Sequence, residues 1–316
     1  MILKVSRYID LETLLFPSFA LPLFTRDNNV YIKRWGACSG LKIWIENNEV
    51  YIEHDSTQCI DYALNYVLGR WCSFETLSCS YGIRDERFSY VLSSLKELYP
   101  YMGVSTSPLD DIALFVSIFL SRNTDFHVNV VKWMNRMFML CGDDWDCIVR
   151  ILRERPTSIG SSYQIKQLAE VLPQYLELRD VVLASDSDTV KRELLKLKYV
   201  GPKVAFAYIL FVKLDSRYAP LDVNFLTFLR QLRLVPEDCI LPKKELCIRY
   251  SCDDCPSNNR CLEYIVRQYV ERFAGLLQTI VYVHVKKLCK RKMCYLCPLK
   301  GVCRDADMSP QKVSTY

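Results

Sequence analysis

The amino-acid sequence predicts an α+β protein in which a small antiparallel β-rich domain precedes an all-helical body. Three observations predict this class: strand-like alternation over roughly the first 75 residues, a helical period from about Asp85, and two cysteine motifs near the C-terminal end. With 316 residues, half of them apolar, the chain can bury a full core. We expect three units, at residues 1–78, 79–240 and 241–316.

The N-terminal part contains three segments in which apolar and polar residues alternate. They are residues 30–35, 41–46 and 50–54, and each is rich in β-branched and aromatic side chains. Asn47 and Asn48 stand between the last two segments, and asparagine tolerates the backbone angles of a tight hairpin turn. The pattern therefore predicts an antiparallel hairpin within a small sheet.

Most of the remaining chain shows apolar residues at helical spacing. Pro156, Pro173 and Pro236 are expected to lie between helices, because proline disrupts a helix interior. The predicted helices are residues 110–119, 128–140, 162–172, 189–197, 203–212, 223–232 and 264–287.

Composition and charge narrow the class of protein. Charged residues make up 24% of the chain and aromatic residues 12%, which excludes a disordered protein. The longest apolar runs are about half of the roughly 20 residues that span a bilayer, and the N-terminus does not resemble a secretory signal. We therefore expect an intracellular protein. The net charge is only +5, but residues 281–304 hold seven Lys or Arg and no acidic residue, which indicates a polyanionic partner.

Fifteen cysteines are too many for an ordinary intracellular protein. Eight of them form two sets with the same spacing, C-x4-C-x2-C-x5-C, and this repetition indicates metal sites that suit zinc or an iron–sulfur cluster equally by ligand count. The first set is Cys247, Cys252, Cys255 and Cys261, and the second set is Cys289, Cys294, Cys297 and Cys303. The other seven are expected to fill the core as small apolar residues.

One segment carries residues suited to catalysis. A short helix is expected to end near Lys198, a turn passes through Gly201, and Pro202 can open the next helix. Lys203 then lies in the first turn, where the helix dipole favours the neutral, nucleophilic amine, although a surface lysine would fit the same position. Asp222 follows 19 positions later before an amphipathic helix, where an ordinary N-cap is the alternative.

In combination, these residues resemble the helix–hairpin–helix DNA glycosylases. Residues 197–203 and 220–222 match the hairpin and aspartate pattern of that family, and the spacing from Lys203 to Asp222 is that of 8-oxoguanine DNA glycosylases. Residues 120–125 are similar to the loop that fills the space left by an extruded base, with Asn123 as the wedge. Residues 294–303 resemble the iron–sulfur loop of endonuclease III.

The resemblance implies a base-excision-repair DNA glycosylase with abasic-site lyase activity. Lys203 would attack C1′ of a flipped-out nucleotide carrying a damaged, oxidised base such as 8-oxoguanine, and Asp222 would assist. The partner would be double-stranded DNA, bound by a monomer where chromosomal DNA lies, in the nucleoid or the nucleus. DNA contacts are expected at the wedge, the hairpin and the second cysteine loop, through Asn123, Lys198, Tyr199, Val200, Gly201, Lys290, Arg291 and Lys292.

The resemblance also implies a [4Fe–4S] cluster at the second cysteine set. The first set has no counterpart in the family, and its repeated spacing favours a second [4Fe–4S] cluster over zinc or disulfides. The sequence departs from the 8-oxoguanine pattern at Tyr199, Asn224, Ala207 and residues 16–22, so the architecture is implied more directly than the substrate. Two alternatives are a monofunctional glycosylase that uses water with Asp222, and a non-catalytic DNA-binding protein.

Overall fold

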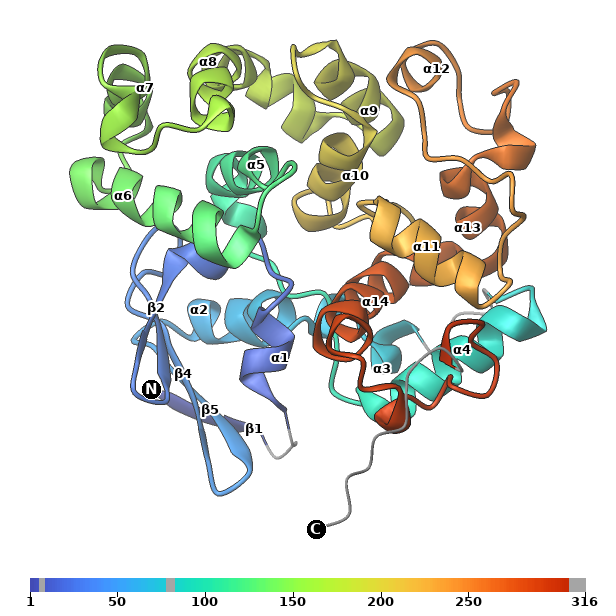
Figure 1. Cartoon of the computed structure of the whole chain (residues 1–316). Coiled ribbons are helices and arrows are strands. Elements are labelled where there is room, and N and C mark those ends of the chain that lie inside the picture. Colours follow the sequence, from blue (N-terminus) through green and yellow to red (C-terminus); the bar gives the residue numbers. More distant parts are fainter. Residues whose placement is uncertain (6–8, 78–82, 307–316) are drawn as a thin grey trace.

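A five-stranded antiparallel sheet lies at one end of a helical body (Figure 1). The computed structural model describes residues 1–5, 9–77 and 83–306. The strand order is β1-β5-β4-β3-β2. The strands are β1 (Ile2–Val5), β2 (Phe24–Asp27), β3 (Val30–Lys33), β4 (Lys42–Glu46) and β5 (Glu49–Glu53).

The central strands confirm the alternation that the sequence predicts. Ile43 on β4 lies opposite Ile52 on β5, and both are fully buried against the helices. Asn47 and Asn48 both have positive φ, at 52° and 62°, which matches the right-handed twist of the hairpin that they close. The sheet gains two edge strands, β1 and β2, that the alternation did not reveal.

Fourteen α-helices among the described residues form the rest of the molecule, with short 3₁₀ and π turns between them. The shorter α-helices are α1 (Leu11–Leu15), α2 (Thr57–Tyr62), α3 (Phe74–Leu77), α11 (Val223–Gln231), α12 (Lys244–Arg249) and α13 (Leu262–Val270). The longer ones are α4 (Glu86–Leu98), α5 (Asp111–Leu120), α6 (Val131–Cys141), α7 (Trp145–Glu154), α8 (Tyr163–Ala184), α9 (Ser187–Lys196), α10 (Pro202–Phe211) and α14 (Ala274–Lys287).

Two helix predictions are wrong in instructive ways. Helix α8 continues through Pro173, since the buried side chains on either side of it, Leu172 and Tyr175 among them, pack well enough to outweigh a cost of roughly 3 kcal/mol. The expected helix at 264–287 is two helices, α13 and α14. They are separated by a 3₁₀ turn that begins at Glu271, whose φ of 42° is incompatible with a continuous helix.

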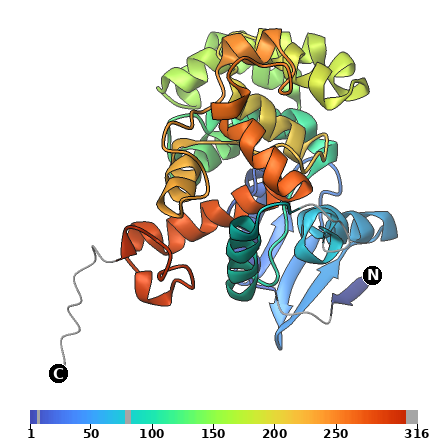
Figure 2. The ribbon, with the colours of Figure 1, turned by 90° about the vertical axis from the view of Figure 1, so that its right-hand side faces the viewer.

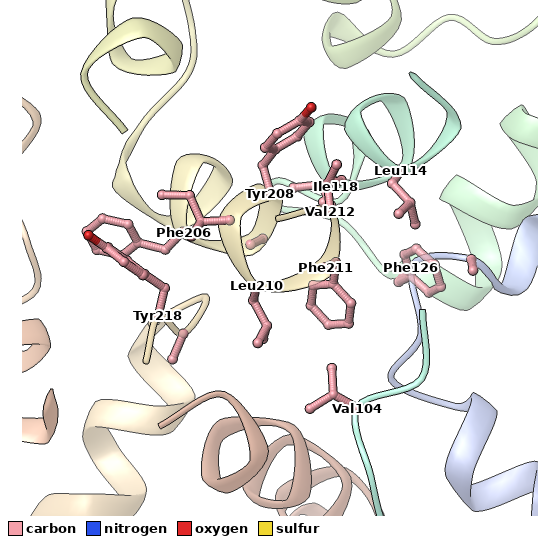
Figure 3. Close-up of a cluster of buried hydrophobic side chains, with 14 of the residues drawn as sticks. Val104, Leu114, Ile118, Phe126, Phe206, Tyr208, Leu210, Phe211, Val212 and Tyr218 are labelled. Carbon is pink, nitrogen blue, oxygen red and sulfur yellow. The ribbon is translucent and has the colours of Figure 1, made fainter. Parts of the chain in front are cut away.

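Helix α10 lies at the centre of the body (Figure 3). All eight residues from 204 to 211 are buried, so this helix is apolar on every side. Figure 3 shows Phe206, Tyr208 and Phe211 directed away from the helix axis into different neighbouring elements. A helix that is held on all sides gives its N-terminal turn, which carries Lys203, a fixed position.

The cysteines outside the two sets correct one prediction. Cys38 bonds to Cys59 and Cys141 bonds to Cys147, with Cα–Cα distances of 5.5 and 5.7 Å. Cys72 and Cys239 are buried thiols, as expected. Cys79 and the predicted domain boundary beside it lie outside the described residues.

The second view shows how the cysteine loops relate to the sheet (Figure 2). The loop that follows α14 and the sheet lie on opposite sides of this view, with the helical body above them. In the described ranges, no helix is both long and apolar enough to cross a membrane.

Candidate active site

The hairpin between α9 and α10 has the turn that the sequence predicts. Leu197 and Val200 are buried and anchor it to the body. Tyr199 has φ of 63°, in the left-handed region that favours glycine. The resembling family pattern has glycine here, so the backbone shape persists although the residue differs. Gly201 caps α10, and a Cβ added to it would meet no atom within 4 Å, so the space beside this turn is open.

Lys203 and Asp222 meet at the start of two helices. The Nζ atom of Lys203, in the first turn of α10, donates to Oδ2 of Asp222 at 3.2 Å. The other carboxylate oxygen of Asp222 accepts from the backbone N–H of Phe225 at 2.9 Å and so caps α11. Asp222 is therefore both the expected N-cap and the partner of the lysine. The Lys203 side chain is 42% exposed and can reach a ligand.

The lysine–aspartate pair lies on the wall of a cavity of about 270 Å³. This volume is close to the lower end of the roughly 300–1,000 Å³ found for small-ligand sites. Five segments line the cavity: the chain after α1 (Phe16, Pro17, Phe19), the α5–α6 connection (Ser121, Asn123, Thr124, Phe126), α10 (Lys203, Phe211), the start of α11 (Pro220, Asp222, Val223, Asn224) and α14 (Gln278, Thr279, Tyr282, Lys286).

Helix α14 supplies cavity residues that the sequence analysis missed. Gln278, Tyr282 and Lys286 are four residues apart, so they form one stripe along the helix. Burial raises the pKa of Tyr282 to about 12, which keeps its hydroxyl neutral. A lone glutamine in the apolar stretch 274–285 was the available signal, because a buried polar side chain in such a helix needs a reason.

The α5–α6 connection presents Asn123 at the cavity and joins the hairpin. Asn123 is exposed and has φ of 50°. The neighbouring Arg122 guanidinium donates to the backbone oxygen of Tyr199 at 2.7 Å and to Oε1 of Gln167 at 2.8 Å. Burial lowers the pKa of Arg122 to about 10, so it remains a cation at neutral pH. This arginine therefore fixes the predicted wedge loop relative to the hairpin.

The same arrangement of helices occurs in solved DNA glycosylase structures. The chain is similar to an 8-oxoguanine glycosylase/lyase from Clostridium acetobutylicum in complex with double-stranded DNA, at 12% identity, over 91% of this chain and 98% of that one, with a TM-score of 0.62. This protein has the fold of the helix–hairpin–helix DNA glycosylases. Neither a protein-family model nor a curated protein matches its sequence.

Two further structures with this glycosylase fold match at similar levels. A 3-methyladenine DNA glycosylase from Archaeoglobus fulgidus is 13% identical over 91% of this chain and 99% of its own, with a TM-score of 0.60. An endonuclease III in a non-covalent complex with DNA is 15% identical over 71% of this chain and 96% of its own, with a TM-score of 0.54.

The predicted hairpin contacts occupy different environments within the glycosylase fold. Lys198 pairs with Glu170 at 2.9 Å and lies over the ring of Tyr199. Val200 is buried, so only its backbone is available to a ligand. In the first turn of α10, Pro202 has no N–H, and the N–H groups of Val204 and Ala205 donate to the backbone oxygen of Gly201 at 3.0 and 3.1 Å. Among the described residues, the N–H of Lys203 has no backbone acceptor.

The second cysteine set follows α14 and is suited to a cluster. Burial raises the pKa of Cys289 to about 12, and the neighbouring thiols add smaller contributions. The backbone N–H of Cys297 donates to the backbone oxygen of Cys294 at 3.0 Å, which brings these two cysteines together. Cys297 Sγ also lies 3.3 Å from Nε2 of the buried His284. Lys290, Arg291 and Lys292 are exposed on the same loop. Residues of this kind and proximity fit a [4Fe–4S] cluster with a basic outer face.

Proposed function

We propose that this protein is a base-excision-repair DNA glycosylase with abasic-site lyase activity. The observation that carries the proposal is the contact of Lys203 Nζ with Asp222 Oδ2 on the wall of a cavity, at the end of a hairpin. Solved structures with this fold include an 8-oxoguanine glycosylase/lyase and an endonuclease III, both bound to DNA, and a 3-methyladenine DNA glycosylase. Such an enzyme acts inside the cell, where chromosomal DNA lies.

The cavity is the place for a base extruded from double-stranded DNA. A glycosylase cannot reach C1′ inside the stack, so the nucleotide must leave the duplex. Phe16 and Tyr282 offer aromatic surface to the base, and the amide of Gln278 can form hydrogen bonds with its edge. Asn123, at the cavity mouth, would occupy the space that the base leaves. We take an oxidised base such as 8-oxoguanine as the first substrate to test.

The reaction starts when Lys203 gives up a proton. Asp222 Oδ2, 3.2 Å away, is placed to accept it. The free amine then forms a bond to C1′ while the bond between C1′ and the base breaks, and the base leaves with the electron pair. Opening of the sugar ring converts the adduct into an imine. Loss of a proton from C2′ then expels the 3′ phosphate and cleaves the strand.

The carboxylate of Asp222 has a second use in the same step. The proton that Asp222 accepts from Lys203 is passed to the departing base, so Asp222 is again a carboxylate as positive charge develops on the sugar, and a nearby fixed carboxylate stabilises that charge. The hydrogen bond from the Phe225 N–H holds this carboxylate in place before the substrate arrives. The helix cap therefore contributes preorganisation as well as stability.

The DNA backbone would be held at two places that carry no sequence information. The backbone N–H groups of Gly201 and Lys203 would bind one phosphate, as helix N-termini do. Lys290, Arg291 and Lys292 would meet the backbone further along the duplex. A [4Fe–4S] cluster held by Cys289, Cys294, Cys297 and Cys303 would supply no chemistry to base removal, and would fix the fold of the loop that presents these cations.

Borohydride trapping tests the proposal. The full-length protein would be incubated with duplexes that carry 8-oxoguanine, thymine glycol, uracil or an abasic site, with Lys203→Gln and Asp222→Asn alongside. We expect a covalent adduct with the unsubstituted protein and none with Lys203→Gln. Asp222→Asn retains the cap through its amide oxygen but loses the charge, so adduct formation should slow by about 10²–10⁴-fold.

Lys213→Gln is the matched control, because Lys213 lies just beyond the other end of α10, where its ammonium donates to the backbone oxygen of Leu183. It should trap like the unsubstituted protein. Base release without any adduct would identify a water-using glycosylase instead. Salt-sensitive binding with neither base release nor an adduct, even on the abasic duplex, would leave a DNA-binding protein without this activity.

A further inference from the structure

The four cysteines of the first set line one small cavity. This cavity lies beside α12, away from the second cysteine loop that follows α14 (Figure 1). Cys247 comes from α12, Cys252 and Cys255 come from the following loop, and Cys261 is the N-cap of α13. All four line the cavity together with Glu263. The four cysteines therefore share one small site, although they come from three different segments.

The two cysteine loops share more than spacing. A proline follows the third cysteine in each set, as Cys255-Pro256 and Cys297-Pro298. The backbone oxygen of Cys255 accepts from the N–H of Asn258 at 3.0 Å, and that of Cys297 accepts from the N–H of Lys300 at 3.2 Å. Both loops therefore turn in the same way after the third cysteine, which indicates that both hold the same kind of group.

Buried charge surrounds the first set in a manner that suits an anionic group. Lys191 is 1% exposed on α9, the helix that packs beside α12. Arg267 on α13 lies 3.6 Å from Asp253, which follows Cys252 in the sequence. Four thiolates around a metal centre carry net negative charge, and buried cations beside it reduce the cost of burying that charge.

A buried oxygen at the same cavity also lacks a partner. Glu263 is 2% exposed, and its Oε1 atom has no hydrogen-bond partner among the described residues. Buried polar atoms almost always have a partner in the protein or in a bound group. Since this side chain lines the cavity that the four thiols surround, the cavity is suited to an occupant with polar atoms.

The two candidate occupants require different spacings of the four sulfurs. Tetrahedral zinc, with Zn–S bonds of about 2.3 Å, would hold its sulfurs about 3.8 Å apart. Within the described ranges, no three Cys, His, Asp or Glu side chains are arranged to hold one metal ion, so the choice of a cluster rests on the repeated spacing and the shared cavity. In a [4Fe–4S] cluster each cysteine binds a different iron, so the thiols lie further apart around a shared centre.

We propose that Cys247, Cys252, Cys255 and Cys261 hold a second [4Fe–4S] cluster, and that this cluster braces the hairpin. Helix α12 packs beside α9, the first helix of the hairpin (Figure 1). Lys244, on α12, donates to the backbone oxygen of Leu197 at 2.9 Å. The cluster thus fixes the helix and turn that precede Lys203. This inference does not depend on the catalytic proposal.

Metal and sulfide analysis of the full-length protein, purified without oxygen, tests the inference. Two clusters would give about eight iron and eight sulfide per chain, and zinc would be absent. Cys252→Ser should lower the iron content about twofold, and the matched Cys294→Ser should do the same at the second set. Hydrogen exchange of residues 187–201 should accelerate in Cys252→Ser and remain unchanged in Cys294→Ser.

Each result decides between the alternatives. About four iron that persist in Cys252→Ser, or one zinc per chain that Cys252→Ser removes, would overturn the proposal. About four iron that disappear in Cys252→Ser would support it and would contradict a cluster at the second set. If Cys252→Ser does not fold, the iron, sulfide and zinc content of the unsubstituted protein still shows whether the chain holds two clusters. Trapping activity plays no part in this measurement, so its failure and failure of the catalytic proposal are distinguishable.

Discussion

The first half of the chain and its last quarter use cysteine in different ways. In the first half, four of the described cysteines pair as two disulfides, Cys38–Cys59 and Cys141–Cys147. In the last quarter, eight cysteines stand in two sets of four, and no disulfide joins them in the part of the chain that the structure describes. One disulfide links the turn after β3 to α2 and the other links α6 to α7, whereas most cysteines of the two sets stand in 3₁₀ turns and loops.

This difference indicates that sequence spacing and local structure together decide whether a cysteine forms a disulfide. The paired cysteines show no motif in the sequence and stand in well-packed segments that already bring the Cα atoms within 6 Å. The cysteines of the two sets stand mostly in loops and short 3₁₀ turns, where the proposed clusters would supply folding energy that a small core cannot.

Removal of the disulfides should have the largest effect on stability. The Cys38–Cys59 bond closes 21 positions and the Cys141–Cys147 bond closes 6, so the chain-entropy model gives losses of about 3 and about 2 kcal/mol for the two double serine variants. Urea unfolding with and without reductant measures both. Iron content should remain unchanged in each variant. A fall in iron, or no change in stability, would break the distinction between the two regions.

Replacement of the buried lysine beside the first cysteine loop should have the next largest effect. Lys191→Met removes a buried charge and its hydrogen bond to Asp188 at 2.9 Å, and should cost about 2 kcal/mol in the free energy of unfolding. Lys196→Met is matched to it, because Lys196 pairs with Glu193 on the same helix at the same spacing but is exposed. It should cost less than about 1 kcal/mol. Equal losses of unfolding free energy in Lys191→Met and Lys196→Met would show that the burial of Lys191 does not contribute to stability.

The smallest effect on stability is expected at the second cysteine loop, where the cations are exposed. Replacing Lys290, Arg291 and Lys292 with alanine should leave the free energy of unfolding almost unchanged. If all three meet phosphates, the slope of log affinity against log salt for duplex DNA should fall by about 2.7. Lys243→Ala with Arg249→Ala, both exposed near the first loop, is the control and should not change the slope. Similar changes in both variants would contradict a specific DNA face.

Much of the fold follows from short-range patterns. The hairpin at Asn47-Asn48, the helix starts at Pro202 and Asp222, and most helix positions were predicted because each depends on a few adjacent residues. The prediction failed where distant packing decides. Pro173 lies inside α8 because side chains far away in the sequence bury the helix around it, and no local rule contains those contacts.

The residues of the candidate site also differ in whether the sequence alone could identify them. Lys203 and Asp222 could be found because their spacing across one hairpin and one helix is a property of the sequence. Phe16 and the α14 stripe through Gln278 could not, because they reach the cavity from positions about 190 residues before and 75 residues after the lysine in the sequence.

The sequence by itself determined the class of fold, the lysine–aspartate pair and the two cysteine sets. Each of these follows from the alternation of apolar residues, the residues of a turn or the spacing of cysteines within one short segment. Tertiary structure decided which cysteines pair, where α13 ends, and which side chains close the cavity around Lys203. Those outcomes depend on contacts between segments that are far apart along the chain. Such contacts form only when many helices pack their apolar faces against one another at the same time, so no single segment of the sequence predicts them.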